Sequence, residues 1–474
     1  MLFNSLGYLV FLPIVFAGYW LLGRKLAWQN LFLLAASYFF YGCWDWRFLF
    51  LLIFSTGLDY FTGIKMAEGS AKRFWFWLSV VVNLGFLGVF KYYNFFVDSF
   101  ADGLARLGFE PHFATLQIIL PVGISFYTFH GLSYVIDIYY DRIKPEKNPV
   151  TYSLFVSYFP LLVAGPIERA THLLPQIKRP RQFHYSQAID GVRQICWGLF
   201  KKIVIADNCA FYADNIFANY QQMNSLTLAV GAIYYAFQIY GDFSGYSDIA
   251  LGTSKLFGID LLRNFNYPYF SRDIAEFWRR WHISLSTWFR DYLYIPLGGS
   301  KGGTWMKVRN TFIIFVVSGF WHGANWTFLV WGALNALYFM PLLLTNNNRM
   351  NLDTVAAGRI WPSLRELASM SVTFALTVIA WIFFRSLTVT DAIGYIKRLF
   401  SYGFAGGVQK IAHERYCIEL GLLLGIFVLA EWHSRQHQHP FFGKMRNVKL
   451  LLALIGLILF GVYSEATNFI YFQF

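Results

Sequence analysis

The sequence predicts an all-α membrane protein that crosses the bilayer many times, and three observations support this fold class. Of its 474 residues, 57% are hydrophobic and only 14% are charged, which is about half the charged share of an ordinary soluble domain. The mean hydropathy is +0.43. The apolar runs, such as 450–462, are continuous, whereas a transmembrane β-barrel strand alternates apolar and polar residues. These features exclude a soluble enzyme, a disordered chain and a small domain on a single anchor.

A spanning helix needs about 20 mostly apolar residues, and the chain has room for about eleven. The first run lacks the basic region and cleavage site of a removable signal peptide, so it should remain as a helix. The predicted spans lie near residues 2–22, 29–44, 46–64, 74–96, 114–140, 191–213, 226–240, 311–344, 369–387, 416–432 and 449–463.

Three stretches do not fit a clean span: one is short and contains two prolines, and two are only partly apolar. Residues 151–166 are short and contain Pro160 and Pro166, which favours a buried or re-entrant piece because broken backbone at membrane depth must be covered by protein. Residues 166–190 are amphipathic and basic, and residues 258–310 interleave arginines with tryptophans. Both patterns are typical of helices that lie at the membrane interface.

We expect one membrane domain over 1–474, with N-terminal helices in 1–110, a core in 111–345 and C-terminal helices in 346–474. The formal net charge is +13. We attribute it to basic loops on the cytoplasmic side and expect no nucleic-acid partner. The loops after the first and third spans are the most basic, which predicts an external N-terminus. The four cysteines form no CxxC pair, so neither a disulfide framework nor a zinc site is indicated.

His322 is the main candidate for chemistry, because an ionisable residue inside an apolar run is a functional hypothesis by default. Buried imidazole is expected to be neutral and able to accept a proton. Gly319 and Gly323 flank it and would let a substrate or another helix approach closely. Asn325 is expected one helical turn further on and could orient the ring or a substrate carbonyl. A core histidine bonded to a neighbouring carbonyl fits the same local sequence equally well.

His282 is the second candidate and lies in a stretch rich in arginine and tryptophan. Arg279 precedes it by three residues, which predicts that both project from one helical face. Together with Arg280 and Trp278, it could bind an anionic donor at the membrane interface. A solvated basic face that meets lipid phosphates is the alternative.

The segment 238–252, QIYGDFSGYSDIALG, places Asp242, Ser244 and Asp248 in an apolar run. Bare carboxylates are too costly there. We expect them to pair with arginines of 258–310 or to line a water-filled funnel, and structural ion pairs are the favoured interpretation.

His130, with Tyr127 and Asp137 nearby, could line the same cavity, although a packing role is equally compatible with the sequence. The histidines at 433, 437 and 439 could bind metal. A solvated loop is favoured there, so no metal site is predicted.

Six strings of the sequence carry a resemblance to a known family: QIYGDFSGYSDIALG, NFNYPYFSRDIAEFWRRWHISLSTWFRDYLYIPLGG, VSGFWHGANWTFLVWGALNA, PVGISFYTF, VAGPIERATHLLPQI and the terminal NFIYFQF. They resemble the membrane-bound O-acyltransferase (MBOAT) family, in its bacterial alginate O-acetylase-like branch, which includes relatives that O-acetylate peptidoglycan and exopolysaccharides. The likeness covers nearly the whole chain and is densest over 118–340.

The resemblance implies a helix bundle around a transmembrane tunnel in the bacterial cytoplasmic membrane. His322 matches the family's catalytic histidine, and His282 matches an upstream polar partner. His130 departs from the pattern, because relatives more often have glutamine there. Acetyl-CoA would be the cytoplasmic donor and His322 the general base, while Asn325 or His282 would stabilise the oxyanion. The acceptor would be a hydroxyl on a separate extracytoplasmic acetyltransferase of the SGNH type.

Other classes stay open at this stage. The chain could be a transporter that uses Asp242, Asp248 and His322 as an ion relay, although no inverted repeat is visible. It could also be a scaffold of a polysaccharide secretion complex. Within the enzyme class, D-alanyl transfer from a carrier thioester is the alternative.

Overall fold

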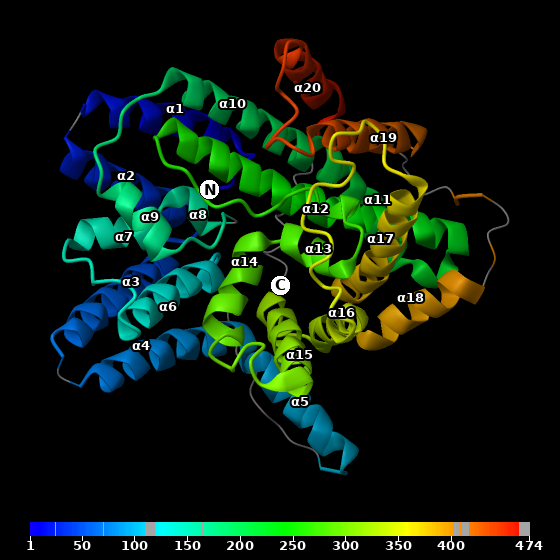
Figure 1. The fold of residues 1–474 in the computed structure, drawn as a ribbon, viewed down its shortest axis with the longest axis horizontal. Helices are drawn as coiled ribbons and strands as arrows, with labels where there is room; N and C mark the ends of the chain where they lie inside the picture. Colours follow the sequence, from blue (N-terminus) through cyan, green and yellow to red (C-terminus); the bar gives the residue numbers. More distant parts are fainter. Residues whose placement is uncertain are drawn as a thin grey trace. The chain divides into compact units, whose positions relative to one another are not determined.

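All regular elements in the described part of the computed structural model are helices (Figure 1). The chain forms two compact units, one of residues 1–191 with 253–262 and the other of residues 192–252 with 263–474. It passes between them inside α10 (Tyr185–Leu199) and inside α12 (Ser225–Leu256). The prediction of one domain over 1–474 stays a prediction. The described residues are 1–23, 25–69, 71–109, 119–163, 165–401, 403, 407–409 and 417–463. The terminal string NFIYFQF therefore lies outside them.

The first unit holds the N-terminal helices. Its elements are α1 (Leu6–Leu21), α2 (Leu26–Gly42), α3 (Trp46–Ala67), α4 (Lys72–Leu87), the π-helical η1 (Gly88–Tyr92), α5 (Tyr93–Arg106), α6 (Ile124–Tyr139), α7 (Pro149–Ser157), α8 (Phe159–Leu162) and α9 (Ala170–Ile177).

The second unit holds the remaining helices. Its elements are η2 (Phe200–Ala206), α11 (Asp207–Ala218), η3 (Tyr220–Gln222), η4 (Pro268–Phe270), α13 (Ile274–Arg280), α14 (Ile283–Phe289), η5 (Arg290–Tyr294), α15 (Gly303–His322), α16 (Trp326–Leu344), α17 (Leu364–Arg385), α18 (Val389–Ser401), α19 (Cys417–Ser434) and α20 (Arg446–Phe460). Of these, η2 and η5 are π-helical and η3 and η4 are 3₁₀-helical.

Side-chain caps fix where several helices begin. The Asp45 carboxylate accepts the Arg47 N–H at the start of α3, and Asn148 caps α7 just before Pro149. Ser363 and Glu366 form a reciprocal capping box at the start of α17. Each cap satisfies backbone N–H groups that have no partner inside the helix.

Among the described residues, four helical stretches are long and apolar enough to cross a membrane: α3, the continuous helix Lys72–Arg106, α16 and α17. The helix α1 is apolar but shorter. The chain is therefore a multi-pass membrane protein, while the count of about eleven spans stays a prediction.

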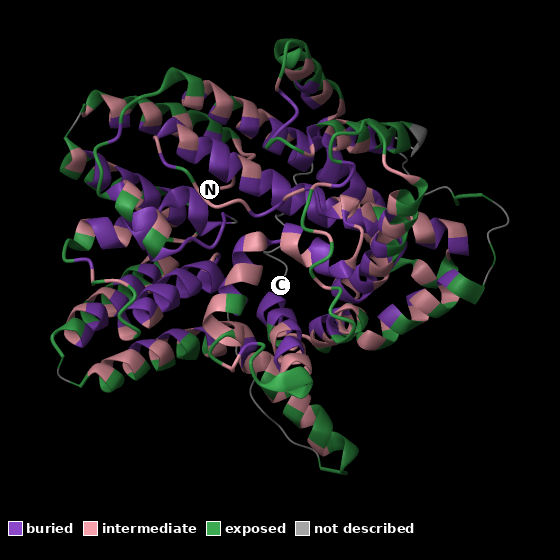
Figure 2. Ribbon diagram, viewed as in Figure 1, coloured by how far each residue is buried: buried purple, intermediate pink, exposed green. Residues whose placement is uncertain are grey.

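Two predicted spans differ from the observed helices. The run 311–344 is not one span, because α15 ends at His322 and α16 begins at Trp326. The run 226–240 is only the first half of α12, whose 32 residues continue to Leu256. Most of α12 is buried, whereas α20 is largely exposed (Figure 2).

The stretch 151–166 is broken, as predicted for a buried or re-entrant piece. It contains most of α7 and all of α8, with Tyr158 between them in a non-helical conformation. Nearly all of its described side chains are buried.

A buried carboxylate joins three helices of the first unit. Asp59 on α3 accepts hydrogen bonds from Ser79 at 2.6 Å and Asn83 at 2.7 Å, both on α4. A Cβ atom at Gly131 on α6 would overlap the same carboxylate. Glycine at this position therefore allows α6 to pack directly on α3.

Candidate active site

Two glycines of the motif in α12 bring this helix against the segment formed by α10 and η2. A Cβ atom on Gly245 would stand 2.7 Å from the carbonyl oxygen of Gly198, and one on Gly198 would stand 2.5 Å from that of Gly245. A Cβ atom on Gly241 would lie 2.9 Å from the carbonyl oxygen of Lys201. Small residues four apart allow this close backbone approach.

Two lysines of η2 neutralise the acidic residues of the motif. Lys202 lies 2.9 Å from Asp242 and 2.7 Å from Asp207, and Lys201 lies 2.6 Å from Asp248. The interpretation as structural ion pairs agrees with this geometry. The expected arginine partners were wrong, because the partners are lysines from the preceding π-helical segment.

Ser244 and Asp248 line a small cavity of about 20 Å³, together with Lys201 and Arg263. This space is large enough for about one water molecule. This cavity is a polar niche, and the broader water-filled funnel that the sequence suggested as one possibility stays a prediction.

Asn264 holds the segment of His282 against α12. Its backbone carbonyl accepts the Ile283 N–H at 2.9 Å, and its side-chain oxygen accepts the Ser284 hydroxyl at 2.6 Å. Its amide nitrogen donates to Ser247 on α12 at 2.9 Å. One buried side chain thus fixes the position of the histidine from two directions.

The spacing predicted that His282 and Arg279 project from one helical face, and this prediction was wrong. His282 lies between α13 and α14. Its backbone is left-handed, with φ +43° and ψ +54°. Its side chain is buried, and its ring centre lies 4.6 Å from that of Phe243 on α12. Among the described residues, neither of its ring nitrogens has a hydrogen-bond partner. The ring is therefore held in place by packing, and its two nitrogens are buried without a hydrogen bond from the described residues.

His322 is the last residue of α15, where the chain breaks before α16. Glycines pack these two helices together: a Cβ atom on Gly319 would overlap the carbonyl oxygen of Phe328, and one on Gly323 would overlap the Phe328 ring. The sequence predicted that these glycines let either a substrate or another helix approach closely, and in the structure the neighbour is another helix, α16. The break places the imidazole at a helix terminus inside the protein, where it is 3% exposed.

Asn325 begins α16 and does not lie one turn further along the helix of His322. Its side-chain oxygen accepts the Thr327 N–H at 3.0 Å, and its amide donates to the Leu387 carbonyl at 2.9 Å. Its side chain is therefore engaged in capping α16 and in anchoring the end of α17.

The two histidines lie close together in an aromatic setting. The ring centres of His282 and His322 are 6.3 Å apart. The His322 ring also lies 5.2 Å from Trp331 and 5.4 Å from Phe384. Beyond this layer, Trp278 lies 5.6 Å from Trp331. The sequence did not single out Trp331 or Phe384, although the density of tryptophans around His322 was a usable signal.

The arginines that precede His282 bind protein groups. Arg279 donates to the carbonyls of Asn348 at 2.7 Å and Asn351 at 2.8 Å. Arg280 pairs with the buried Glu276 at 2.8 Å and donates to the Asp353 carbonyl at 2.8 Å. These contacts anchor the loop between α16 and α17, and a role in binding an anionic donor stays a prediction.

The same network includes Arg272, which pairs with Glu276 and lies 2.8 Å from the Asp353 carboxylate. The hydrogen bond from Arg272 lowers the pKa of the Asp353 carboxyl group. Sequence reasoning missed Glu276 as the centre of this network, although its spacing of four residues from both Arg272 and Arg280 is the pattern of helical ion pairs.

Tyr127 and His130 lie on α6 in the first unit, and both are buried. His130 accepts the Glu168 N–H at 3.0 Å through Nε2. The prediction that they share a cavity with His322 stays a prediction. In the described part of the chain, no three His, Cys, Asp or Glu side chains are grouped to hold a metal ion.

The fold and the site together define a class: a multi-pass helical membrane protein with a buried pair of histidines. A family model described as "MBOAT, membrane-bound O-acyltransferase family" matches residues 140–360, which include both histidines. The chain belongs to this family, and it is an enzyme of the O-acyltransferase class.

Three relatives show the range of this similarity. The chain is 39% identical over 435 residues to the probable alginate O-acetylase AlgI of Pseudomonas aeruginosa, which covers 91% of this chain and 80% of the relative. It is 35% identical over 430 residues to the peptidoglycan O-acetyltransferase of Helicobacter pylori, with coverages of 84% and 79%. It is 29% identical over 243 residues to the teichoic acid D-alanyltransferase of Bacillus subtilis, with coverages of 48% and 60%.

Proposed function

We propose that this protein is an O-acetyltransferase of the bacterial cytoplasmic membrane that serves the O-acetylation of a cell-envelope polysaccharide. The observation that carries the proposal is the buried pair of His282 and His322, 6.3 Å apart between ring centres, inside the region that the family model matches. The relatives that align over most of this chain are named for alginate and peptidoglycan O-acetylation, which supports an acetyl group and a polysaccharide destination.

The proposed reaction moves an acetyl group from acetyl-CoA to a hydroxyl. A ring nitrogen of His322 takes the hydroxyl proton while the oxygen attacks the thioester carbonyl. The tetrahedral intermediate then collapses, its C–S bond breaks, and the proton passes from His322 to the departing thiolate. The products are the acetyl ester and CoA.

His282 is the better candidate for stabilising the oxyanion. Among the described residues its ring nitrogens have no partner, whereas the side-chain atoms of Asn325 are already bonded to Thr327 and Leu387. A donor held in place before the reaction is the kind that stabilises developing charge well. We therefore assign this role to His282 and a capping role to Asn325.

In this proposal the donor approaches from the cytoplasm and the acceptor is a hydroxyl of an extracytoplasmic SGNH-type acetyltransferase. That partner would pass the acetyl group to the polysaccharide, and the external N-terminus belongs to the same topology. Membership of an acyltransferase family argues against the transporter and scaffold alternatives. D-alanyl transfer from a carrier thioester is less favoured, because the teichoic acid relative aligns with only 48% of this chain.

The test uses sealed inverted membrane vesicles with labelled acetyl-CoA on the cytoplasmic face and the purified partner inside. We expect His322→Ala to lower the transfer rate by about 10²–10⁴-fold and His282→Ala to lower it substantially. The exposed His184, changed to Ala, is the matched control and should retain the rate.

Normal transfer by His322→Ala at equal expression would refute the general-base assignment. Transfer of label only from a D-alanyl carrier thioester would mean that this thioester, and not acetyl-CoA, is the donor.

A further inference from the structure

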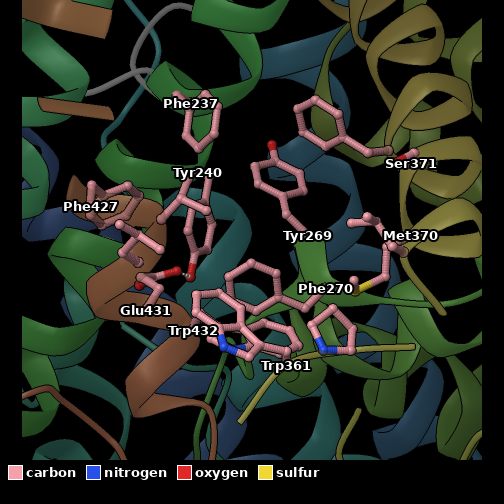
Figure 3. Close-up of a pocket in the computed structure, with 15 residues that line it drawn as sticks. Phe237, Tyr240, Tyr269, Phe270, Trp361, Met370, Ser371, Phe427, Glu431 and Trp432 are labelled. Carbon is pink, nitrogen blue, oxygen red and sulfur yellow. Dashed lines mark hydrogen bonds between the residues drawn. The ribbon is translucent and has the colours of Figure 1, made fainter. Parts of the chain in front are cut away.

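A large apolar pocket lies in the second unit between α12, α17 and α19 (Figure 3). Its volume is about 540 Å³, within the usual range of small-molecule sites. Its walls are mostly aromatic and aliphatic. They include Phe237 and Tyr240 of α12, Met370 and Phe374 of α17, and Phe427 of α19.

One carboxylate interrupts this apolar lining. Glu431 is 4% exposed, and its Oε2 accepts a hydrogen bond of 2.6 Å from the Tyr240 hydroxyl (Figure 3). In the described part of the chain, its Oε1 has no hydrogen-bond partner. Glu431 also lines the small polar niche of Lys201 and Asp248, so its carboxylate stands at the border of the two spaces. A buried carboxylate oxygen without a partner is costly, which favours a ligand that donates a hydrogen bond.

The polar and apolar parts of the pocket lie at different depths along the helices. Glu431 and Trp432 belong to the last turn of α19, and Trp361 immediately precedes α17. Phe374 lies ten residues into α17, about 15 Å from the helix start. The Glu431 carboxylate therefore lies near the level at which α17 begins. Since α17 is long and apolar enough to span a membrane, the apolar part of the pocket extends along it toward the hydrocarbon core of the bilayer.

The wall of the pocket continues into the outer surface of the helices. Trp361, Leu367 and Leu429 line the pocket, yet they are 66%, 49% and 56% exposed. The Trp432 indole donates to the Ile360 carbonyl at 2.8 Å, which fixes the corner beside the carboxylate. A tryptophan-rich rim above an apolar surface is typical of the boundary between lipid headgroups and hydrocarbon chains.

From this arrangement we infer that the pocket binds a membrane phospholipid whose headgroup carries an ammonium group, as in phosphatidylethanolamine. The ammonium donates to Oε1 of Glu431, and one hydrocarbon chain lies along Met370 and Phe374 toward Phe237. A charge-assisted N–H to carboxylate bond is among the stronger hydrogen bonds. The inference does not depend on the acetyl donor or acceptor.

Aromatic rings connect the lipid pocket with the surroundings of His322. Trp281 lies 6.1 Å from Tyr240 and 5.0 Å from Trp381. Trp381 in turn lies 5.6 Å from Trp331, which contacts His322. A bound lipid would therefore support the far side of the aromatic layer that packs around the candidate base.

The test compares two photoreactive probes, phosphatidylethanolamine and phosphatidylcholine, that carry the same diazirine-bearing chain. The full-length protein is reconstituted in phosphatidylglycerol vesicles, and cross-linked residues are mapped by mass spectrometry. We expect the phosphatidylethanolamine probe to label Met370 and Phe374 roughly tenfold more than the phosphatidylcholine probe, which lacks N–H donors. Glu431→Gln should remove this preference.

Phe374→Trp should fill the apolar part and lower labelling by both probes. Its matched control is Val372→Trp, on the same helix with a side chain that is 60% exposed; this control should leave labelling unchanged. Met370→Trp replaces Phe374→Trp if the latter does not fold. Equal labelling by the two probes in the wild type would overturn the inference, as would equal labelling of the Phe374→Trp and Val372→Trp variants.

Discussion

Removal of the Lys202 ammonium should destabilise the second unit more than any other single charge removal described above. Lys202 lies within 2.9 Å of Asp207 and Asp242, and all three side chains are at most 4% exposed. Lys202→Met keeps most of the volume but leaves two buried carboxylates without their cation. Breaking a buried ion pair in this way costs about 3–5 kcal/mol of unfolding free energy. Because Lys202 pairs with two carboxylates, we expect the loss for Lys202→Met to lie toward the upper end of this range.

The same reasoning predicts a rescue. The triple variant with Lys202→Met, Asp207→Asn and Asp242→Asn carries no uncompensated charge, so most of the lost free energy should return. Lys201→Met is the matched single control. Its partner Asp248 is 15% exposed and keeps a hydrogen bond from Gln194 at 2.8 Å, so the expected loss is smaller.

The free energy of unfolding would be measured in mixed micelles by following helical circular dichroism against increasing SDS. A loss below about 1 kcal/mol for Lys202→Met would refute the view that the lysine is the indispensable member of the cluster. A triple variant as unstable as the single one would show that the geometry of the hydrogen bonds, and not the charge, carries the stability.

Three further predictions follow from local geometry. Gly319→Ala should cost about 1–3 kcal/mol of unfolding free energy, because its Cβ meets the rigid carbonyl of Phe328. Asn325→Ala should cost about 1 kcal/mol through loss of the cap on Thr327, yet leave the acetyl-transfer rate near wild type below the melting temperature. The Glu168 carboxylate raises the pKa of His172, so His172 stabilises the fold below its ordinary pKa of about 6.5. That contribution, under about 1 kcal/mol because the His172 side chain is 38% exposed, is lost as pH rises through the folded pKa.

Each of these predictions has a control and a contradicting outcome. Gly421→Ala, where no described atom lies within 4 Å, should be neutral or slightly stabilising, and a loss equal to that of Gly319→Ala would remove the steric argument. Asn325→Asp should keep the cap and hence the stability that Asn325→Ala loses. A large loss of acetyl-transfer rate in Asn325→Ala would mean that Asn325, and not only His282, stabilises the oxyanion. The melting-temperature difference between wild type and His172→Gln should shrink from pH 6 to pH 8. A difference that grows would mean that the sign of the pKa shift is wrong.

The helices themselves were largely predictable, because continuous apolar runs and caps are local features. The break between α15 and α16 was not predicted, because the long apolar run outweighed two local signals: Gly323 at the end of α15 and the N-cap residue Asn325 of α16. The chain at Gly323 also packs against the ring of Phe328. The π-helical η2 was also missed, since its lysines meet Asp242 and Asp248 on α12, about forty residues later in the sequence.

The candidate site was predictable in its residues but not in its geometry. His322 was identified as an ionisable residue in an apolar run, and His282 as a histidine in an arginine- and tryptophan-rich stretch. Family resemblance supported both, and the structure brings their rings together. Helical spacing paired His282 with Arg279, but α13 ends at Arg280. The partner that positions His282 is Asn264, eighteen residues earlier, and no local pattern reveals a tether of that kind.

The left-handed backbone of His282 sets stability and chemistry against each other at one position. A side chain with a Cβ pays about 1 kcal/mol for this conformation, so the fold alone would accept glycine or asparagine there more readily. Selection for a robust fold and selection for a working enzyme therefore favour different residues at position 282. In a mutational library, variants that gain thermal tolerance at this position and lose turnover would identify the imidazole as a feature retained for the reaction.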